Sequence, residues 1–116
     1  MKLKTFAVLA VVLACASAAH ADKYTKKNGV AEITTQGDKT LISLVSTVGQ
    51  NRCELEGPAR RIDADRIAYT SDDADDKCVA VLNTKGGKLV VTTKSCEMAC
   101  GNGAAGSMDG NYSKAR

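Results

Sequence analysis

Short apolar runs alternate with glycine or aspartate turn signals along most of the chain from residue 30 onwards. Valine, isoleucine and threonine, which favour extended backbone, dominate these runs. This part of the sequence has no long stretch with the 3.6-residue spacing of an amphipathic helix. The pattern predicts six strands: Val30–Thr35, Thr40–Val48, Arg52–Gly57, Arg66–Thr70, Lys77–Asn83 and Lys88–Thr93.

The run from Arg52 to Glu56 shows this pattern most clearly, because charged and apolar side chains alternate at every residue. Successive side chains of a strand point to opposite faces. Cys53 and Leu55 are therefore expected on the buried face, and Glu54 and Glu56 in water. The strand pattern as a whole suggests these core residues: Leu41, Leu44, Leu55, Ile67, Val79, Val81, Leu89 and Val91.

Turn residues between the predicted strands set the fold class. Gly86 and Gly87 lie between the last two strands, where a tight hairpin needs positive φ. Close turns make neighbouring strands antiparallel, so the sequence predicts an all-β fold, a small antiparallel meander closed as a barrel or folded as a sandwich. Pro58 has no backbone N–H and is expected to end the Cys53 strand or to mark a sheet edge. Residues 22–29 are polar and are expected to form a loose lead-in.

The first 21 residues have the features of a secretory signal peptide. Lys2 and Lys4 precede an apolar stretch from Thr5 to Ala14. A small-x-small cleavage site, Ala-His-Ala at 19–21, then precedes Asp22. The apolar stretch is shorter than the roughly 20 residues that a membrane-spanning helix needs. We therefore expect export, with no transmembrane segment in the chain.

Cleavage after residue 21 divides the chain into a signal peptide, 1–21, and a single β domain, 22–116, located in the periplasm. A degenerate lipobox before Cys15 supports an alternative, an outer-membrane lipoprotein anchored at that residue. Loss of the leader removes two lysines and the only histidine, His20. The remaining domain is nearly neutral, which gives no electrostatic basis for binding nucleic acid. It also lacks imidazole, the most common general base in enzymes.

Four cysteines remain in the exported domain: Cys53, Cys78, Cys96 and Cys100. An even number in an oxidising compartment predicts two disulfides, for which three pairings exist. We favour a long link between Cys53 and Cys78 with a local link between Cys96 and Cys100. A zinc site is disfavoured because the spacing lacks paired C-x-x-C knuckles.

Carboxylates gather between residues 63 and 76 without the pattern of a known site. The stretch 71–76 lacks the glycine and the closing glutamate of a calcium loop, so a solvated acidic turn is expected. With no tryptophan and one phenylalanine, the chain offers little aromatic surface on which a sugar could stack beside Glu54 and Glu56. The sequence predicts no metal ion, no cofactor and no catalytic residue, so we expect a protein that is not an enzyme.

The segment 101–111 is rich in glycine and gains little from burial. Cys100 at its start and Tyr112 just after its end would tether it as a shaped, partner-binding loop. A second interpretation is a closing β-turn at Asp109 and Gly110 that packs Tyr112 onto the core. The two interpretations are compatible.

A Cys-led strand at 78–82, the C-x-x-x-C-G motif at 96–101 and the terminal Asp-Gly-Asn-Tyr at 109–112 follow a leader sequence. This order resembles the small exported lysozyme-inhibitor-like proteins of proteobacteria. The resemblance implies a small β-barrel that inserts a loop bearing a serine and a lysine into the acidic cleft of lysozyme. The counterparts here are Ser107 and Lys114, and we add Asp109 and Tyr112 of the same segment as partner-binding residues.

The expected function is that of a non-catalytic periplasmic binding protein that inhibits lysozyme or a related cell-wall hydrolase. An acidic turn would attract a strongly cationic enzyme, and a disulfide-held loop loses little entropy on binding. The alternative is a small structural or interaction module of the envelope, lipid-anchored or free, with no inhibitory role. Both alternatives have a protein partner and no cofactor.

Overall fold

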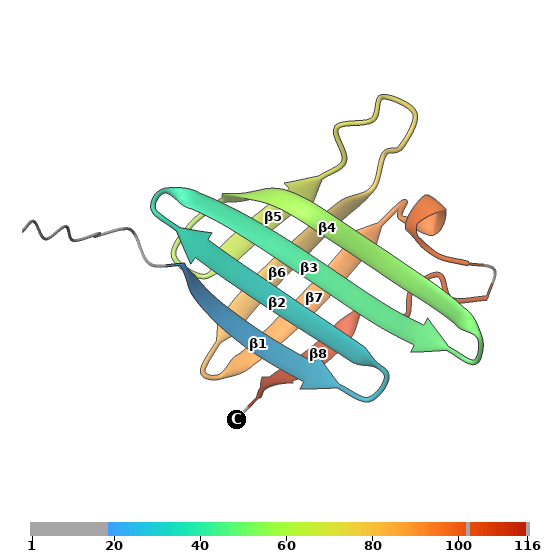
Figure 1. Cartoon of the computed structure of the whole chain (residues 1–116), viewed down its shortest axis with the longest axis horizontal. Coiled ribbons are helices and arrows are strands. Elements are labelled where there is room, and N and C mark those ends of the chain that lie inside the picture. Colours follow the sequence, from blue (N-terminus) through green and yellow to red (C-terminus); the bar gives the residue numbers. More distant parts are fainter. Residues whose placement is uncertain (1–18, 102, 116) are drawn as a thin grey trace, which may run out of the picture.

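The computed structural model describes residues 19–101 and 103–115, which form a closed barrel of eight antiparallel strands in chain order (Figure 1). The signal-peptide features between residues 1 and 18, including Cys15, lie outside the described residues. The barrel closes where the last strand pairs with the first, through Tyr24 with Lys114 and Thr25 with Ser113. The strands are β1 (His20–Lys26), β2 (Gly29–Gln36), β3 (Lys39–Val48), β4 (Asn51–Arg61), β5 (Arg66–Thr70), β6 (Val79–Lys85), β7 (Lys88–Lys94) and β8 (Gly110–Lys114).

The all-β prediction is confirmed, and the closed barrel decides between the two architectures that the sequence left open. Two strands were missed. The expected lead-in is β1, which pairs with β2 from His20 opposite Thr35 to Lys26 opposite Gly29. The glycine-rich end contains β8, paired with both β7 and β1. Without these two strands the meander would have two open edges, so they are the elements that close it.

The core contains most of the apolar residues that the alternation selected, with three exceptions. Leu41 is 42% exposed, and Val79 and Val81 are half-buried on the outer face. The error is a shift of one residue, which turns a strand's side chains to the opposite face. The residues that fill these inward positions and the other core positions include Ile33, Ile42, Leu44, Leu55, Ile67, Cys78, Ala80, Leu82, Leu89, Val91 and Tyr112.

Pro58 does not end its strand, because β4 continues to Arg61. The alternative expectation, that Pro58 marks a sheet edge, agrees with the pairing of β4. β4 pairs with β3 from Asn51 to Ala59, whereas its pairing with β5 is limited to Arg60 with Ala68 and Arg61 with Ile67. A residue without an N–H is tolerated at such an edge because no neighbouring strand requires its donor.

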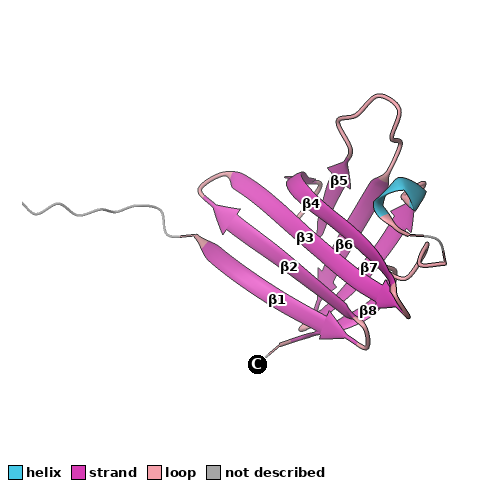
Figure 2. Ribbon diagram, turned by 45° about the vertical axis from the view of Figure 1, so that its right-hand side comes forward, coloured by secondary structure: helices cyan, strands magenta, loops and turns pink. Residues whose placement is uncertain are grey.

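The barrel has two different ends. The termini end carries His20, Ala115 and the tight turns at 37–38 and 86–87, while the cap end carries the β5–β6 loop (71–78) and residues 95–109, which we name the cap. The cap contains the 3-10 helix η1 (Glu97–Ala99). Figure 2 shows η1 and the long β5–β6 loop on one side of the molecule and the C-terminus on the opposite side. In the part of the chain that the structure describes, no helix is long and apolar enough to cross a bilayer.

Candidate functional site

The cap closes a gap that the short strand β5 leaves in the barrel wall. β4 has 11 residues and β5 has 5, so β5 does not reach the cap end beside β4. η1 contacts β4 there, and Gly101 donates its N–H to the carbonyl of Arg52 at 3.0 Å. Ala104 and Met108 are fully buried, so the cap also contributes side chains to the core.

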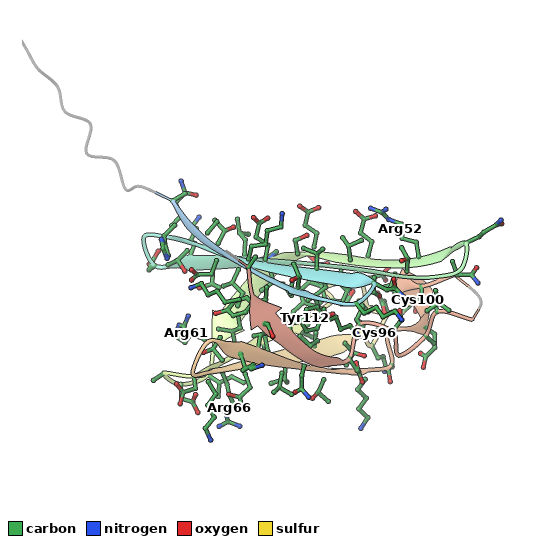
Figure 3. All side chains as sticks on the ribbon, turned by 90° about the horizontal axis from the view of Figure 1, so that it is seen from below. Arg52, Arg61, Arg66, Cys96, Cys100 and Tyr112 are labelled. Atoms are coloured by element: carbon green, nitrogen blue, oxygen red, sulfur yellow. A yellow bond between two sulfur atoms is a disulfide. The ribbon has the colours of Figure 1, made fainter. Side chains whose placement is uncertain are left out.

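Two disulfides attach the cap to the strands on either side of this gap. Cys100 is bonded to Cys53 of β4, and Cys96 is bonded to Cys78, which immediately precedes β6. The predicted use of all four cysteines in two disulfides is confirmed, but the favoured pairing of Cys53 with Cys78 and of Cys96 with Cys100 is wrong. The reason is topological: β5 lies between β4 and β6 in the barrel, and the cap, which follows β7, reaches from the start of β6 at Cys78 to the start of β4 at Cys53. Figure 3 shows Cys96 and Cys100 at the same end of the molecule.

A lysine from the first strand holds the second half of the cap. The Lys26 ammonium donates hydrogen bonds to the backbone carbonyls of Ser107 and Asp109, both at 2.7 Å. The same nitrogen lies 5.3 Å from the ring centroid of Tyr112, a cation–π distance. Bonds from a charged donor are stronger than neutral ones, so this lysine fixes the path of residues 107–109.

Ser107 and Asp109 are themselves bonded to the barrel wall. The hydroxyl of Ser107 lies 2.6 Å from that of Ser46, which is 1% exposed. One carboxylate oxygen of Asp109 accepts hydrogen bonds from the backbone N–H and the hydroxyl of Thr93. Both predicted site residues therefore hold the cap in place, and their role in binding a partner stays a prediction.

Tyr112 is fully buried, and its hydroxyl donates a hydrogen bond to the carbonyl of Met108 at 2.7 Å. Burial, with a smaller contribution from the charge of Asp109, raises the pKa of Tyr112 to about 12. The expected packing of this ring onto the core is confirmed, but the β-turn expected at Asp109 and Gly110 is wrong: the turn lies at 105–108, and Gly110 is already the first residue of β8. Figure 3 shows the ring between the two layers of strands, so it supports the cap from inside and does not face a partner.

Lys114, the fourth predicted residue, lies at the opposite end of β8. Its ammonium pairs with the carboxylate of Asp22 at 2.9 Å and lies 5.7 Å from the ring centroid of Tyr24. The hydrogen bond from Lys114 lowers the pKa of Asp22. The structure thus brings Ser107, Asp109 and Tyr112 together at the cap and places Lys114 at the termini end.

The exposed part of the cap is mainly backbone and small side chains. Gly101, Gly103, Ala105 and Gly106 are exposed, and Met98 on η1 is the most exposed large apolar residue among those that the structure describes, at 69%. Sequence reasoning located this segment but missed the contacts of Lys26, Ser46 and Thr93. Their partners lie far away along the chain, 81 residues in the case of Lys26 and Ser107.

The β5–β6 loop at the same end carries exposed carboxylates. Asp73 accepts the backbone N–H of Asp75, and Asp76 accepts that of Cys78, so side chains within the loop support its turns. Asp72 and Asp75 are exposed. The expected solvated acidic turn is what the structure contains. Within the described ranges, no group of three or more His, Cys, Asp or Glu side chains is placed to hold a metal ion.

We expect the substitution Lys26→Met to lower the free energy of unfolding by about 2 kcal/mol, because two charge-assisted hydrogen bonds are lost. Amide hydrogen exchange in residues 104–109 should become faster than in the rest of the barrel, since the cap is released locally. Lys27→Met is the matched control, because Lys27 is exposed at the adjacent turn. Equal exchange rates in the two variants would contradict this role of Lys26.

Comparison with models of known protein families, with curated proteins and with solved structures found no match to the chain.

Proposed function

We propose that this protein is a non-catalytic periplasmic binding protein that uses its cap end to inhibit lysozyme or a related cell-wall hydrolase. The observation that carries the proposal is the fixation of the cap by two disulfides and by Lys26. A surface that is already rigid loses little conformational entropy when it binds. The exposed glycines leave the backbone of the cap accessible to a partner's cleft.

The filled interior also favours a surface function. Large apolar side chains occupy the centre of the barrel, among them Tyr112, Ile42, Leu44, Leu82 and Leu89, each at most 1% exposed. A small β-barrel of this kind is a packed core rather than a ligand cavity. A partner would therefore bind to the outer surface of the barrel or to its loops.

Charge favours a cationic partner at the cap end. The β5–β6 loop contributes Asp72, Asp73 and Asp75, which are exposed, and η1 contributes Glu97. Arg61 and Arg66 lie at the termini end, away from Cys96 and Cys100 (Figure 3). The cap end also has exposed cations, so its negative charge is local to the β5–β6 loop and η1; these cations are Lys27, Arg52, Lys77 and Lys94. A cationic hydrolase would be steered toward the β5–β6 loop, and complementary rim charges mainly raise the association rate.

The test is inhibition of chicken-type, goose-type and invertebrate-type lysozymes by the purified exported domain. We expect inhibition of at least one class. Asp72→Asn/Asp75→Asn should weaken that inhibition about fivefold at low ionic strength, because two exposed charges near the interface are lost. Neither side chain is needed for the turn bonds of the loop, in which Asp73 and Asp76 are the acceptors.

The matched control is Asp38→Asn/Asp65→Asn, which removes the same charge from exposed positions at the termini end. This variant should inhibit as well as the unmodified protein. Failure to inhibit any of the three classes would refute the proposed function, and an equal loss in both variants would refute the assignment to the cap end.

A further inference from the structure

The wall of the barrel contains a seam where β4 and β5 part. The two strands pair only through Arg60 with Ala68 and Arg61 with Ile67, although β4 continues for nine residues toward the cap end. η1 and the Cys53–Cys100 link cover the far end of this side of β4. Between them, the described part of the chain supplies no strand partner for the segment 55–59 on this side.

Backbone geometry shows which groups point into the seam. Arg52 directs its carbonyl away from β3, because that oxygen accepts the N–H of Gly101. Backbone groups of a strand alternate between its two sides with a period of two. Glu54, Glu56 and Pro58 therefore direct their carbonyls to the same side as Arg52, and Glu56 also directs its N–H there. Pro58 has no N–H, so Glu56 is the donor at the centre of this edge.

Side chains from both banks line a furrow along the seam. Its lining residues are Glu56 and Pro58 from β4 and Tyr69, Thr70 and Asp72 from the other bank. The Tyr69 ring packs over Gly57, with Cε2 at 3.1 Å from the position that a Cβ of residue 57 would take. The ring thus forms the floor of the furrow where the two strands diverge.

The charges on the two sides of the furrow indicate which kind of segment it can bind. Glu56 is exposed on β4, and Asp72 lines the furrow with it. Glu54 is also exposed on this strand and forms an exposed ion pair with Arg52 at 3.6 Å, a contact that a basic partner would have to share. A second copy of this chain would place glutamates against glutamates across an antiparallel pair, which is destabilising, and charged residues with a proline are a known protection against such self-pairing. An extended segment with lysine or arginine at alternate positions meets opposite charge on both banks.

We propose that the seam binds a basic extended segment of a partner protein, which adds to β4 as an extra strand. Its lysine or arginine side chains lie on the outer face beside Glu54 and Glu56. Its alternate apolar side chains point inward toward the ring of Tyr69. This surface lies outside the cap (95–109), although it shares Asp72 with the acidic β5–β6 loop, and it does not require the partner to be a lysozyme.

The probe is a capped seven-residue peptide of alternating lysine and valine, titrated into the exported domain. Calorimetry should detect binding, and at saturation amide exchange at Glu56 should slow at least tenfold. A lysine opposite Glu56 directs its own N–H and C=O to β4. Methylation of the lysine backbone nitrogens should therefore abolish binding, whereas the same change at the valines should leave it intact.

Side-chain variants test the charge selection. Glu54→Gln/Glu56→Gln should lower the affinity for the peptide about fivefold, because two cross-strand ion pairs are lost. Glu32→Gln is the control, since Glu32 lies in β2, which is paired on both sides. Equal binding of the two methylated peptides, or unchanged exchange at Glu56, would refute strand addition. Concentration-dependent dimers that protect Glu56 without peptide would refute the proposed occupant.

The outcomes of the two proposals are separable. Peptide binding without inhibition of any lysozyme would refute only the proposed function. Inhibition through the cap without peptide binding would refute only the strand addition at the seam.

Discussion

Replacing Cys53 and Cys100 together by alanine is expected to lower the free energy of unfolding by about 4 kcal/mol, according to the loop-entropy model. This disulfide joins residues 47 positions apart, so its loss frees a long loop in the unfolded chain. The corresponding double substitution at Cys78 and Cys96, with a separation of 18, should cost about 3 kcal/mol. Urea unfolding of both variants measures the two values.

The two variants should also differ in the local stability of the cap in the folded protein. Without the Cys53–Cys100 disulfide the cap loses its attachment to β4, while Lys26 still holds residues 107–109. We expect faster amide exchange at residues 97–101 than at the centre of the barrel. Peptide mapping of the unreduced protein checks the pairing directly. A fragment that joins Cys96 to Cys100 would contradict the structure.

The substitution Tyr112→Ala is expected to destabilise the protein by about 3–5 kcal/mol, the range for truncating a large buried ring. Tyr112 is the largest of the fully buried side chains, and it contacts the cap through the carbonyl of Met108. Tyr112→Phe keeps the ring and removes the hydroxyl, so it should cost only about 1 kcal/mol. Thermal or urea unfolding distinguishes the two variants, and similar losses would show that the ring does not fill the core as described.

Alkaline titration gives an independent check on Tyr112. Its pKa is about 12 in the folded protein and 10.0 as the ordinary value, so the unfolded chain loses this proton first. Stability therefore falls as the pH rises from about 10 to about 12. Tyr112→Phe should lose less stability over this interval, because it lacks the phenol whose proton the unfolded chain loses first. Identical pH curves would contradict the burial of the hydroxyl.

The sequence predicted the strands whose inward positions are filled by several apolar residues. β3 and β7 show this clearly, with Ile42 and Leu44 in one and Leu89 and Val91 in the other. β1 was missed because its inward face carries Tyr24 between two charged residues, Asp22 and Lys26, at the two ends of the barrel. Barrel closure, rather than local pattern, makes this segment a strand.

The disulfide pairing shows a second limit of local reasoning. Cys96 and Cys100 are close along the chain, and η1 between them directs them to β6 and β4 respectively. β5 is only five residues long and leaves a gap between β4 and β6. The cap fills this gap, which brings Cys100 to Cys53 and Cys96 to Cys78. Spacing alone does not contain that information.

The candidate site was predicted in part for the same reason. Ser107 and Asp109 were selected from the glycine-rich segment, and both lie in the cap. Lys114 was selected together with Ser107 from the resemblance to lysozyme-inhibitor-like proteins, but β8, a strand of five residues, places it at the other end of the barrel. The residue that fixes the cap, Lys26, has no local signal because its acceptors are carbonyls at the far end of the chain.

In the function that we propose, the protein presents its cap end to a cationic cell-wall hydrolase. The most direct test is amide hydrogen exchange of the protein with and without the lysozyme class that it inhibits. We expect new protection at residues 101–109 and 72–76, with no change at the turns 37–38 and 86–87. Protection confined to the termini end, or none with any of the three lysozyme classes, would contradict it.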